Sequence, residues 1–239
     1  MNDRLTGKIA REQLNRLALQ WKQGEHILVS GGTGSGKTTL ARHLDEIRIR
    51  RGGSVVVFVC KAEDASIAKH YAGWTRWTEW HRRPGPAENR ILLWPKVKGK
   101  NLFEQRRLWR KTFAEALDDI GSKGKWTVHL DDALFMTSPV HLAFGREIAM
   151  AHQMLRSMKG TIITLAQRPS HLPLEVYACI DHAFVGASRE AADLKRLANL
   201  DGSSSSKELQ QMIAANGKHD FVWIKCNSRA APERVNLSV

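Results

Sequence analysis

An eight-residue segment near the amino terminus has the composition of a phosphate-binding loop. Residues 31–38 read Gly-Gly-Thr-Gly-Ser-Gly-Lys-Thr, which matches the pattern G-x-x-x-x-G-K-[ST] in full. Glycines let successive backbone N–H groups turn inward around phosphate oxygens. In this pattern Lys37 reaches the β- and γ-phosphates, and the Thr38 hydroxyl ligates Mg²⁺. The sequence therefore predicts a site for ATP and Mg²⁺, with the binding residues Gly31, Gly32, Thr33, Gly34, Ser35, Gly36, Lys37, Thr38 and Thr39.

A pair of adjacent acids follows a mostly apolar run at 127–130. We expect Asp131 to hold the coordination shell of the metal at the end of a strand. Asp132 would then orient or deprotonate the attacking water. An apolar run that ends in two acids is often only a solvated strand end, but the upstream phosphate loop favours the catalytic interpretation. Aspartate is one methylene shorter than the glutamate common here, so either this strand end lies closer to the γ-phosphate or another acid such as Glu147 assists.

A third polar position follows the apolar run at 161–165. The amide of Gln167 can form hydrogen bonds with both the γ-phosphate and the water that attacks it, so Gln167 could sense hydrolysis. The alternative is a polar strand end that caps the turn before Pro169. The position of Gln167, one helix after the two acids, favours a role at the nucleotide.

Alternating strands and helices must position these residues. The pattern predicts an α/β fold with a mainly parallel central sheet and helices on both faces. Residues 73–90 look irregular, and 96–101 form a basic loop. We expect a core at 24–200 with a basic insertion at about 73–111, a helical extension at 1–23, and a helix-strand extension at 201–239. The expected strands are 26–30, 54–60, 91–94, 126–130, 161–165, 182–186 and 221–226, and the expected helices are 4–22, 37–50, 64–71, 102–119, 139–158, 188–197 and 207–215.

Composition limits the class of protein. The chain has 239 residues, and no apolar stretch approaches the ~20 residues that span a bilayer. The amino terminus lacks an apolar signal region. The three cysteines, Cys60, Cys179 and Cys226, are too widely spaced for a zinc pattern or a disulfide framework. Cys60 and Cys226 lie in strand-like runs and are expected to be buried thiols. These features predict a protein of the cytoplasm.

The charge is strongly positive and concentrated in one segment. The formal net charge is +13, and eleven cations between Arg76 and Lys111 face three glutamates, a local excess of +8. Such a segment suits a polyanionic partner such as nucleic acid. The alternative is that the charge serves solubility alone, but its concentration in one segment argues against that. Nearby tryptophans could stack on bases, but packing beneath the irregular segment is the favoured role for Trp74, Trp77, Trp80 and Trp94. The candidate DNA contacts are Lys96, Lys98, Lys100, Arg106 and Arg107.

The order of these motifs resembles the FtsK–HerA superfamily of DNA-pumping ATPases. Leu165 to Pro169, read as Leu-Ala-Gln-Arg-Pro, is similar to the Ala-Thr-Gln-Arg-Pro motif of that family. The Asp-Pro-Lys turn and following Glu of the family are matched only in part by residues 60–63. The resemblance covers about 24–200. It implies a RecA-like P-loop NTPase fold of the ASCE type with strand order 5-1-4-3-2, and a pentameric or hexameric ring that moves double-stranded DNA.

In size and simplicity the chain looks most like the genome-packaging ATPases of phages, which implies a capsid portal or vertex protein as a further partner. Ring ATPases of this kind take an arginine from the neighbouring subunit. The candidates are Arg146, Arg156 and Arg168. Arg156 is favoured because it follows Asp131 by about 25 residues in the sequence, close to where related packaging motors place this arginine. Two alternatives stay open: a plasmid or mobile-element DNA transfer ATPase, and a P-loop kinase or switch that acts on a small substrate.

Overall fold

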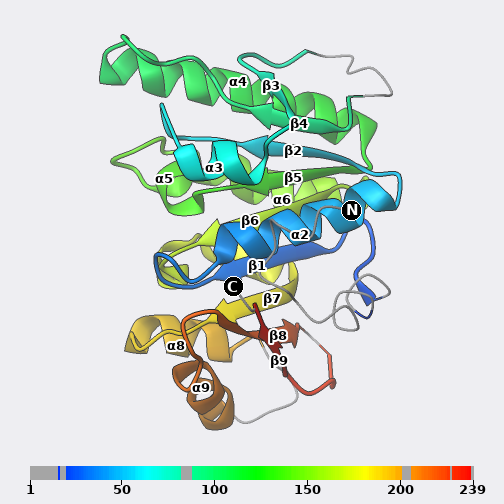
Figure 1. Ribbon diagram of the computed structural model, residues 1–239, viewed down its shortest axis with the longest axis vertical. Helices are drawn as coiled ribbons and strands as arrows, with labels where there is room; N and C mark the ends of the chain where they lie inside the picture. The colour runs from blue at the N-terminus through cyan, green and yellow to red at the C-terminus, as the bar shows by residue number, and fades with distance from the viewer. Residues whose placement is uncertain (1–15, 17–19, 82–87, 201–205, 227, 238–239) are drawn as a thin grey trace.

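The computed structural model describes residues 16, 20–81, 88–200, 206–226 and 228–237. One sheet runs through it, with the strand order β3-β4-β2-β5-β6-β1-β7-β8-β9 (Figure 1). The strands from β3 to β7 pair in parallel, and β8 and β9 are added antiparallel. The bounds are β1 His26–Ser30, β2 Ser54–Phe58, β3 Thr75–Trp77, β4 Arg90–Leu93, β5 Trp126–Leu130, β6 Thr161–Ala166, β7 Ile180–Gly186, β8 Asp220–Lys225 and β9 Glu233–Asn236.

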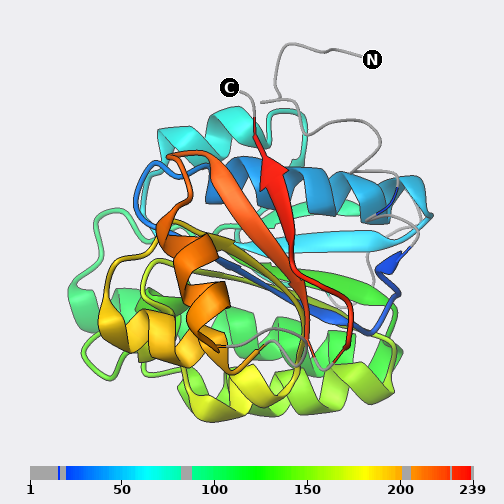
Figure 2. The ribbon, with the colours of Figure 1, turned by 90° about the horizontal axis from the view of Figure 1, so that it is seen from below.

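Helices cover both faces of the sheet. Figure 2 shows α2 and α3 on one face and α4 and α6 on the other. Each face buries its own apolar clusters, as expected where parallel strands are covered on both sides. The predicted α/β architecture is therefore confirmed. The helices are α2 Lys37–Arg50, α3 Ala65–His70, α4 Leu102–Lys123, α5 Ala133–Thr137, α6 Gly145–Ser157, η2 Pro169–His171, α7 Leu174–Ala178, α8 Ala191–Ala198 and α9 Ser206–Ala214.

The order of the central strands decides where the motifs meet. The strands β2-β5-β6-β1-β7 correspond to the order 2-3-4-1-5 when β3 and β4 are set aside, which is the expected 5-1-4-3-2 read from the other edge. β6 lies between β1 and β5, so it separates the strand before the phosphate loop from the strand before the acid pair. Because parallel strands end at one edge, the segments after β1, β5 and β6 converge there.

Local signals explain most element boundaries. The β-branched run of β2 is buried at every position after Ser54. α4 begins with a capping box, in which Asn101 and Glu104 each accept a hydrogen bond from the other's backbone N–H. α2 begins after Gly36, whose φ of 95° lies in the left-handed region that favours glycine.

The helix expected at 139–158 is α6, but its expected start is wrong, because α6 begins only at Gly145. The short helix α5, which ends before this range, was not expected, and a turn separates α5 from α6. Pro139 follows the end of α5, where its preceding residue is steered away from helical geometry. The turn is closed by backbone hydrogen bonds from Leu142 and Phe144 to the carbonyls of Phe135 and Met136, at 3.2 and 2.8 Å.

Other differences are smaller. The segment at 73–90 contains the edge strand β3, so it is not wholly irregular, and α4 continues to Lys123 instead of ending at 119. The helix expected at 4–22 falls almost entirely outside the described residues. Packing is confirmed for the four tryptophans at 74, 77, 80 and 94, which are at most 8% exposed.

The cysteines and the helices agree with the composition. All three cysteines are buried free thiols, which confirms the expectation for Cys60 and Cys226. Within the described part of the chain, every helix is too short or too polar to cross a bilayer.

Candidate nucleotide-binding site

The phosphate loop joins the buried strand β1 to the start of α2. Gly34 and Gly36 have φ values of 74° and 95°, a conformation that other residues adopt only with strain. No side chain caps the amino end of α2. The first N–H groups of a helix lack partners within the helix, so this end of α2 can donate to an anion.

Lys37 lies across the loop that precedes it. Its Nζ donates to the carbonyl oxygens of Gly31 and Gly32, at 2.8 Å each. Burial lowers the pKa of Lys37, and the nearby Asp132 and Asp131 oppose that shift. The Oγ of Ser35 is buried and has no hydrogen-bond partner among the described residues. An orphaned hydroxyl and a lysine held by loop carbonyls fit a bound phosphate group, which offers partners to both.

The two acids lie at the end of β5 as expected. Burial raises the pKa of Asp131, while His129 and Lys61 counteract the shift. Asp132 caps α5, because its Oδ1 accepts from the backbone N–H of Phe135 at 3.0 Å. The cap fixes the direction of this side chain and uses Oδ1, so Oδ2 can accept a proton. Carboxylate and hydroxyl oxygens suit Mg²⁺, so Asp131 and Thr38 fit a magnesium nucleotide.

Two adjacent side chains after β6, those of Gln167 and Arg168, contact different parts of the protein. Gln167 is exposed, and its Oε1 lies 3.4 Å from the Oγ1 of Thr33 in the phosphate loop. Arg168 turns to α8 instead, where its Nε donates to the buried Asp193 at 2.8 Å. The backbone N–H of Ser170 donates to the same carboxylate at 3.0 Å. The amide therefore faces the loop, and the arginine holds the turn in place.

Three sequence candidates lie apart from this group. The hydroxyl of Thr39 lies 3.2 Å from the Nε2 of His70, towards α3. The carboxylate of Glu147 accepts from Arg110 at 2.6 Å. Arg156, near the end of α6, pairs with Asp181 near the start of β7, at the opposite edge of the sheet from the phosphate loop. In its own chain Arg156 therefore does not contact the site.

The structure adds Lys61 to the site, a residue predicted only as part of the incomplete motif match at 60–63. Phe58 pairs with Leu130, so the chain leaving β2 runs beside the acid pair. The Nζ of Lys61 donates to Asp64 at 2.8 Å. Burial works against the charge of Lys61, but Asp64, Asp131 and Asp132 together raise its pKa. The register between β2 and β5 places Lys61 near the acids. Lys61 could be predicted as a site residue only by knowing that these two strands are neighbours.

The carboxyl-terminal strands also reach the phosphate loop. The Nδ1 of His219 lies 3.4 Å from the carbonyl oxygen of Ser35. A Cβ on Gly36 would lie 2.9 Å from the Cδ1 of Leu237, so this glycine also permits close packing. No local pattern could predict these contacts, because they depend on β8 pairing antiparallel with β7.

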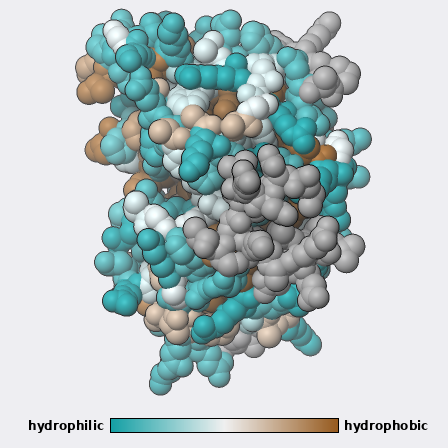
Figure 3. Space-filling view, viewed as in Figure 1, coloured by the Kyte–Doolittle hydropathy of each residue, from teal (hydrophilic) through white to brown (hydrophobic). Residues whose placement is uncertain are grey.

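The basic residues lie at the same edge of the sheet. Lys96, Lys98 and Lys100 are exposed on the turn that joins β4 to α4. On the first turns of α4, Arg107 is exposed and Arg106 is half-buried. Figure 3 shows a mostly hydrophilic face with apolar areas along its left side, over the start of α4 and the turn after α5. The exposed side chains there are Leu102, Phe103 and Val140, at 79%, 85% and 82%.

Strand order, phosphate loop and acid pair together define a RecA-like P-loop NTPase fold. The chain is similar to B204, the DNA-packaging ATPase from Sulfolobus Turreted Icosahedral Virus, with a TM-score of 0.60 and 16% identity over 92% of this chain and 100% of that chain. B204 from Sulfolobus turreted icosahedral virus 2, in complex with AMPPCP, gives a TM-score of 0.62 and 14% identity over 92% and 100%.

VirB4 of Thermoanaerobacter pseudethanolicus has the same fold. Its TM-score is 0.63 and its identity 8%, over 90% of this chain and 89% of that chain. No protein-family model matches the sequence, and no curated protein does. The similarity to solved structures therefore shows the fold.

Proposed function

We propose that the protein is an ATP-hydrolysing motor subunit that moves double-stranded DNA during the packaging of a viral genome. One observation carries the proposal: the phosphate loop, the acid pair, Gln167 and the cationic turn after β4 share one edge of the sheet. The two B204 proteins, described as packaging enzymes, support it because they match this chain over nearly their whole length. The proposed place of action is the host cytoplasm.

The residues at the site divide the chemistry of hydrolysis. Lys37 and the amino end of α2 would hold the β- and γ-phosphates, and Thr38 with Asp131 would hold Mg²⁺. Bound Mg²⁺ would neutralise charge on the phosphate oxygens. Oδ2 of Asp132 would accept the proton of the attacking water. Gln167, beside Thr33, would contact the γ-phosphate and change its contacts when that group leaves.

An arginine from a neighbouring subunit would complete the site. Arg156 remains our proposal for this residue, with a side chain that is 47% exposed but paired with Asp181. Arg156 would have to leave this pair to reach a neighbour's phosphate. Arg146 is the alternative, because it is exposed on the first turn of α6 and pairs with no carboxylate among the described residues.

An apolar area beside the site supports assembly into a ring. Leu102, Phe103 and Val140 border a cavity of about 530 Å³ that Lys61 and Phe135 also line. Large exposed apolar side chains at one place mark contacts with other proteins. A second copy seated here would lie next to the nucleotide, where a ring needs its subunit interface. The ring would have five or six members, and a capsid portal or vertex protein would be its docking partner.

DNA would be held by charge and not by sequence. The exposed turn with Lys96, Lys98 and Lys100, together with Arg106 and Arg107, offers cations for phosphate contacts. Phosphate contacts carry affinity without sequence information, which suits a motor that must accept any sequence.

DNA transfer by a plasmid or mobile element is the second candidate, favoured by the similarity to the pCW3 conjugation coupling protein TcpA, with a TM-score of 0.53 and 13% identity over 93% of this chain and 62% of that chain. The motor chemistry would be the same, and the cargo machinery would differ. A P-loop kinase or switch that acts on a small substrate is the alternative of another class.

Displacement of a third strand from duplex DNA tests the proposal. A motor that moves along the duplex should release a labelled triplex-forming strand when ATP is added, and should not do so with a non-hydrolysable analogue. The Lys37→Ala variant is the control, because it removes the lysine of the loop. Release that is independent of ATP, or no release by a protein that hydrolyses ATP, would contradict translocation.

A further inference from the structure

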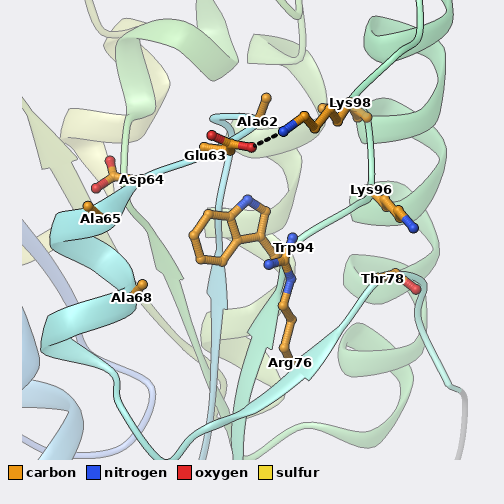
Figure 4. A pocket seen from close by; sticks show the side chains of 11 residues that line it. Ala62, Glu63, Asp64, Ala65, Ala68, Arg76, Thr78, Trp94, Lys96 and Lys98 are labelled. Atoms are coloured by element: carbon orange, nitrogen blue, oxygen red, sulfur yellow. Dashed lines mark hydrogen bonds and ion pairs between the residues drawn. The ribbon is translucent and has the colours of Figure 1, made fainter.

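A separate hollow lies between α3 and the edge strand β3, and we name it the α3–β3 cleft. Its volume is about 480 Å³, and its polar lining includes Glu63, Asp64, Arg76, Trp94, Lys96 and Lys98. Figure 4 shows the Glu63–Lys98 ion pair at one end of the cleft and Arg76 at the other, with the indole of Trp94 between them.

A buried tryptophan holds one cation of the cleft in place. Trp94 is 4% exposed, and its Nε1 donates to the carbonyl oxygen of Lys61 at 2.7 Å. The guanidinium carbon of Arg76 lies 4.2 Å from the centre of the indole ring, a cation–π distance. Among the described residues, no carboxylate pairs with Arg76 or Lys96. Two of the three cations are therefore available to an anion.

The two acids of the cleft differ in how firmly they are held. Asp64 is committed to the protein, because it accepts from Lys61 at 2.8 Å and caps α3 through the N–H of Ile67. Within the part of the chain that the structure describes, the side chain of Glu63 bonds only Lys98, at 2.9 Å, and both side chains are more than 70% exposed. Ion pairs this exposed contribute little and exchange readily. An incoming anion can therefore replace Glu63 as the partner of Lys98, but it cannot easily displace Asp64 from Lys61 and the end of α3.

We propose that the α3–β3 cleft binds the phosphodiester backbone of DNA through Arg76, Lys96 and Lys98, and that the carboxylate of Glu63 occupies Lys98 until a phosphate displaces it. This inference rests on the proposed function, since it specifies where the DNA is held. Arg76 and Glu63 are thereby added to the residues that set the affinity for DNA. Arg76 would strengthen DNA binding, and Glu63 would weaken it.

The salt dependence of DNA binding tests the role of Arg76. Binding of a short labelled duplex is followed by fluorescence anisotropy over a series of KCl concentrations. The slope of log K against log [KCl] should become shallower by about one in Arg76→Gln, because one phosphate contact is lost. Arg76→Lys should keep the wild-type slope, because charge is what the slope counts. Arg50→Gln, an exposed arginine at the end of α2 and the other edge of the sheet, is the matched control.

The opposing effect of Glu63 is the sharper test. Glu63→Gln should bind the duplex about two- to fivefold more tightly, the scale of an exposed ion pair. Glu79→Gln removes the same charge from an exposed residue that does not line the cleft, and it should change affinity less. Thermal melting of each variant shows whether it is folded.

The outcomes separate this inference from the proposed function. Equal slopes for Arg76→Gln and Arg50→Gln, in a wild-type protein that binds the duplex, overturn the cleft and leave the motor intact. Weaker ATP binding by Arg76→Gln without a change in DNA binding would assign the cleft to a free nucleotide and also overturn it. A wild-type protein that does not bind duplex DNA at all overturns the proposed function itself.

Discussion

Asp132 combines a structural contact with a proposed chemical role, and one substitution separates them. Asparagine caps a helix about as well as aspartate does, but its amide cannot accept the proton of a water. Asp132→Asn should therefore melt at the wild-type temperature and hydrolyse ATP about 10²- to 10⁴-fold more slowly. Turnover by phosphate release and melting by circular dichroism check this expectation. Wild-type turnover in Asp132→Asn would mean that another group activates the water.

The arginine proposed to act on a neighbour's nucleotide makes a different prediction. Arg156→Ala should lose ATPase activity and still bind a nucleotide analogue, because its own chain does not use Arg156 at the phosphate loop. Arg146→Ala is the comparison. If activity survives in Arg156→Ala and is lost in Arg146→Ala, the arginine has been misassigned. Mixing an inactive Lys37→Ala subunit with an Arg156→Ala subunit should restore part of the activity if the site is shared between chains.

At the scale of single elements, a buried pair of histidines fastens α6 to the sheet. The Nε2 of His26 in β1 donates to the carbonyl oxygen of His152 in α6 at 2.7 Å, and its Nδ1 accepts from the N–H of Ile162 at 3.0 Å. The Nε2 of His152 accepts from Thr164 at 3.1 Å. Burial lowers the pKa of His26 to about 4 and that of His152 to about 3. Both rings are therefore neutral in the folded protein.

These two histidines predict a loss of stability in mild acid. Below pH 6.5 the unfolded chain takes up protons on them, but the folded chain does not until about pH 4 for His26 and about pH 3 for His152. The unfolded state therefore binds more protons in this window, so the free energy of unfolding falls as the pH falls. Each histidine contributes up to about 1.4 kcal/mol per pH unit.

Denaturant unfolding at pH 7 and pH 5 measures this effect. His152→Gln should lose part of the pH dependence, whatever its absolute stability. His171→Gln, at an exposed position, should keep it. Equal pH dependence in wild type and His152→Gln would show that other groups cause the acid sensitivity.

The elements also show what the sequence could and could not predict. The sequence was enough to predict one shared edge of the sheet for the phosphate loop, Asp131, Asp132 and Gln167. Each of these follows a strand, and the strands were expected to be parallel. The short helix α5 was missed, and the start of α6 was expected at Pro139 instead of Gly145, because proline is common in the first turn of a helix and the backbone hydrogen bonds that close the turn before Gly145 are not visible in the sequence pattern. Contacts such as His219 with Ser35, or Lys61 beside the acids, depend on which strands are neighbours, and that information is not local.

In the whole molecule, we expect DNA to bind at the edge of the sheet that carries the nucleotide site and not at the other edge. The triple variant that replaces Lys96, Lys98 and Lys100 with glutamine should make the salt slope of duplex binding shallower by up to about three. The matched control replaces Arg50, Lys125 and Lys159, exposed cations at the other edge, and should leave the slope nearly unchanged. Equal effects of the two triple variants would mean that net charge, and not this edge, attracts DNA.

The central claim is that DNA is the partner on which this nucleotide site acts. The most direct measurement is the rate of ATP hydrolysis by the purified protein with and without duplex DNA, with Lys37→Ala as the control. We expect the rate to rise several-fold when duplex DNA is added and to fall to background in Lys37→Ala. An ATPase rate that duplex DNA leaves unchanged, in a protein that transfers phosphate to a small acceptor, would contradict it.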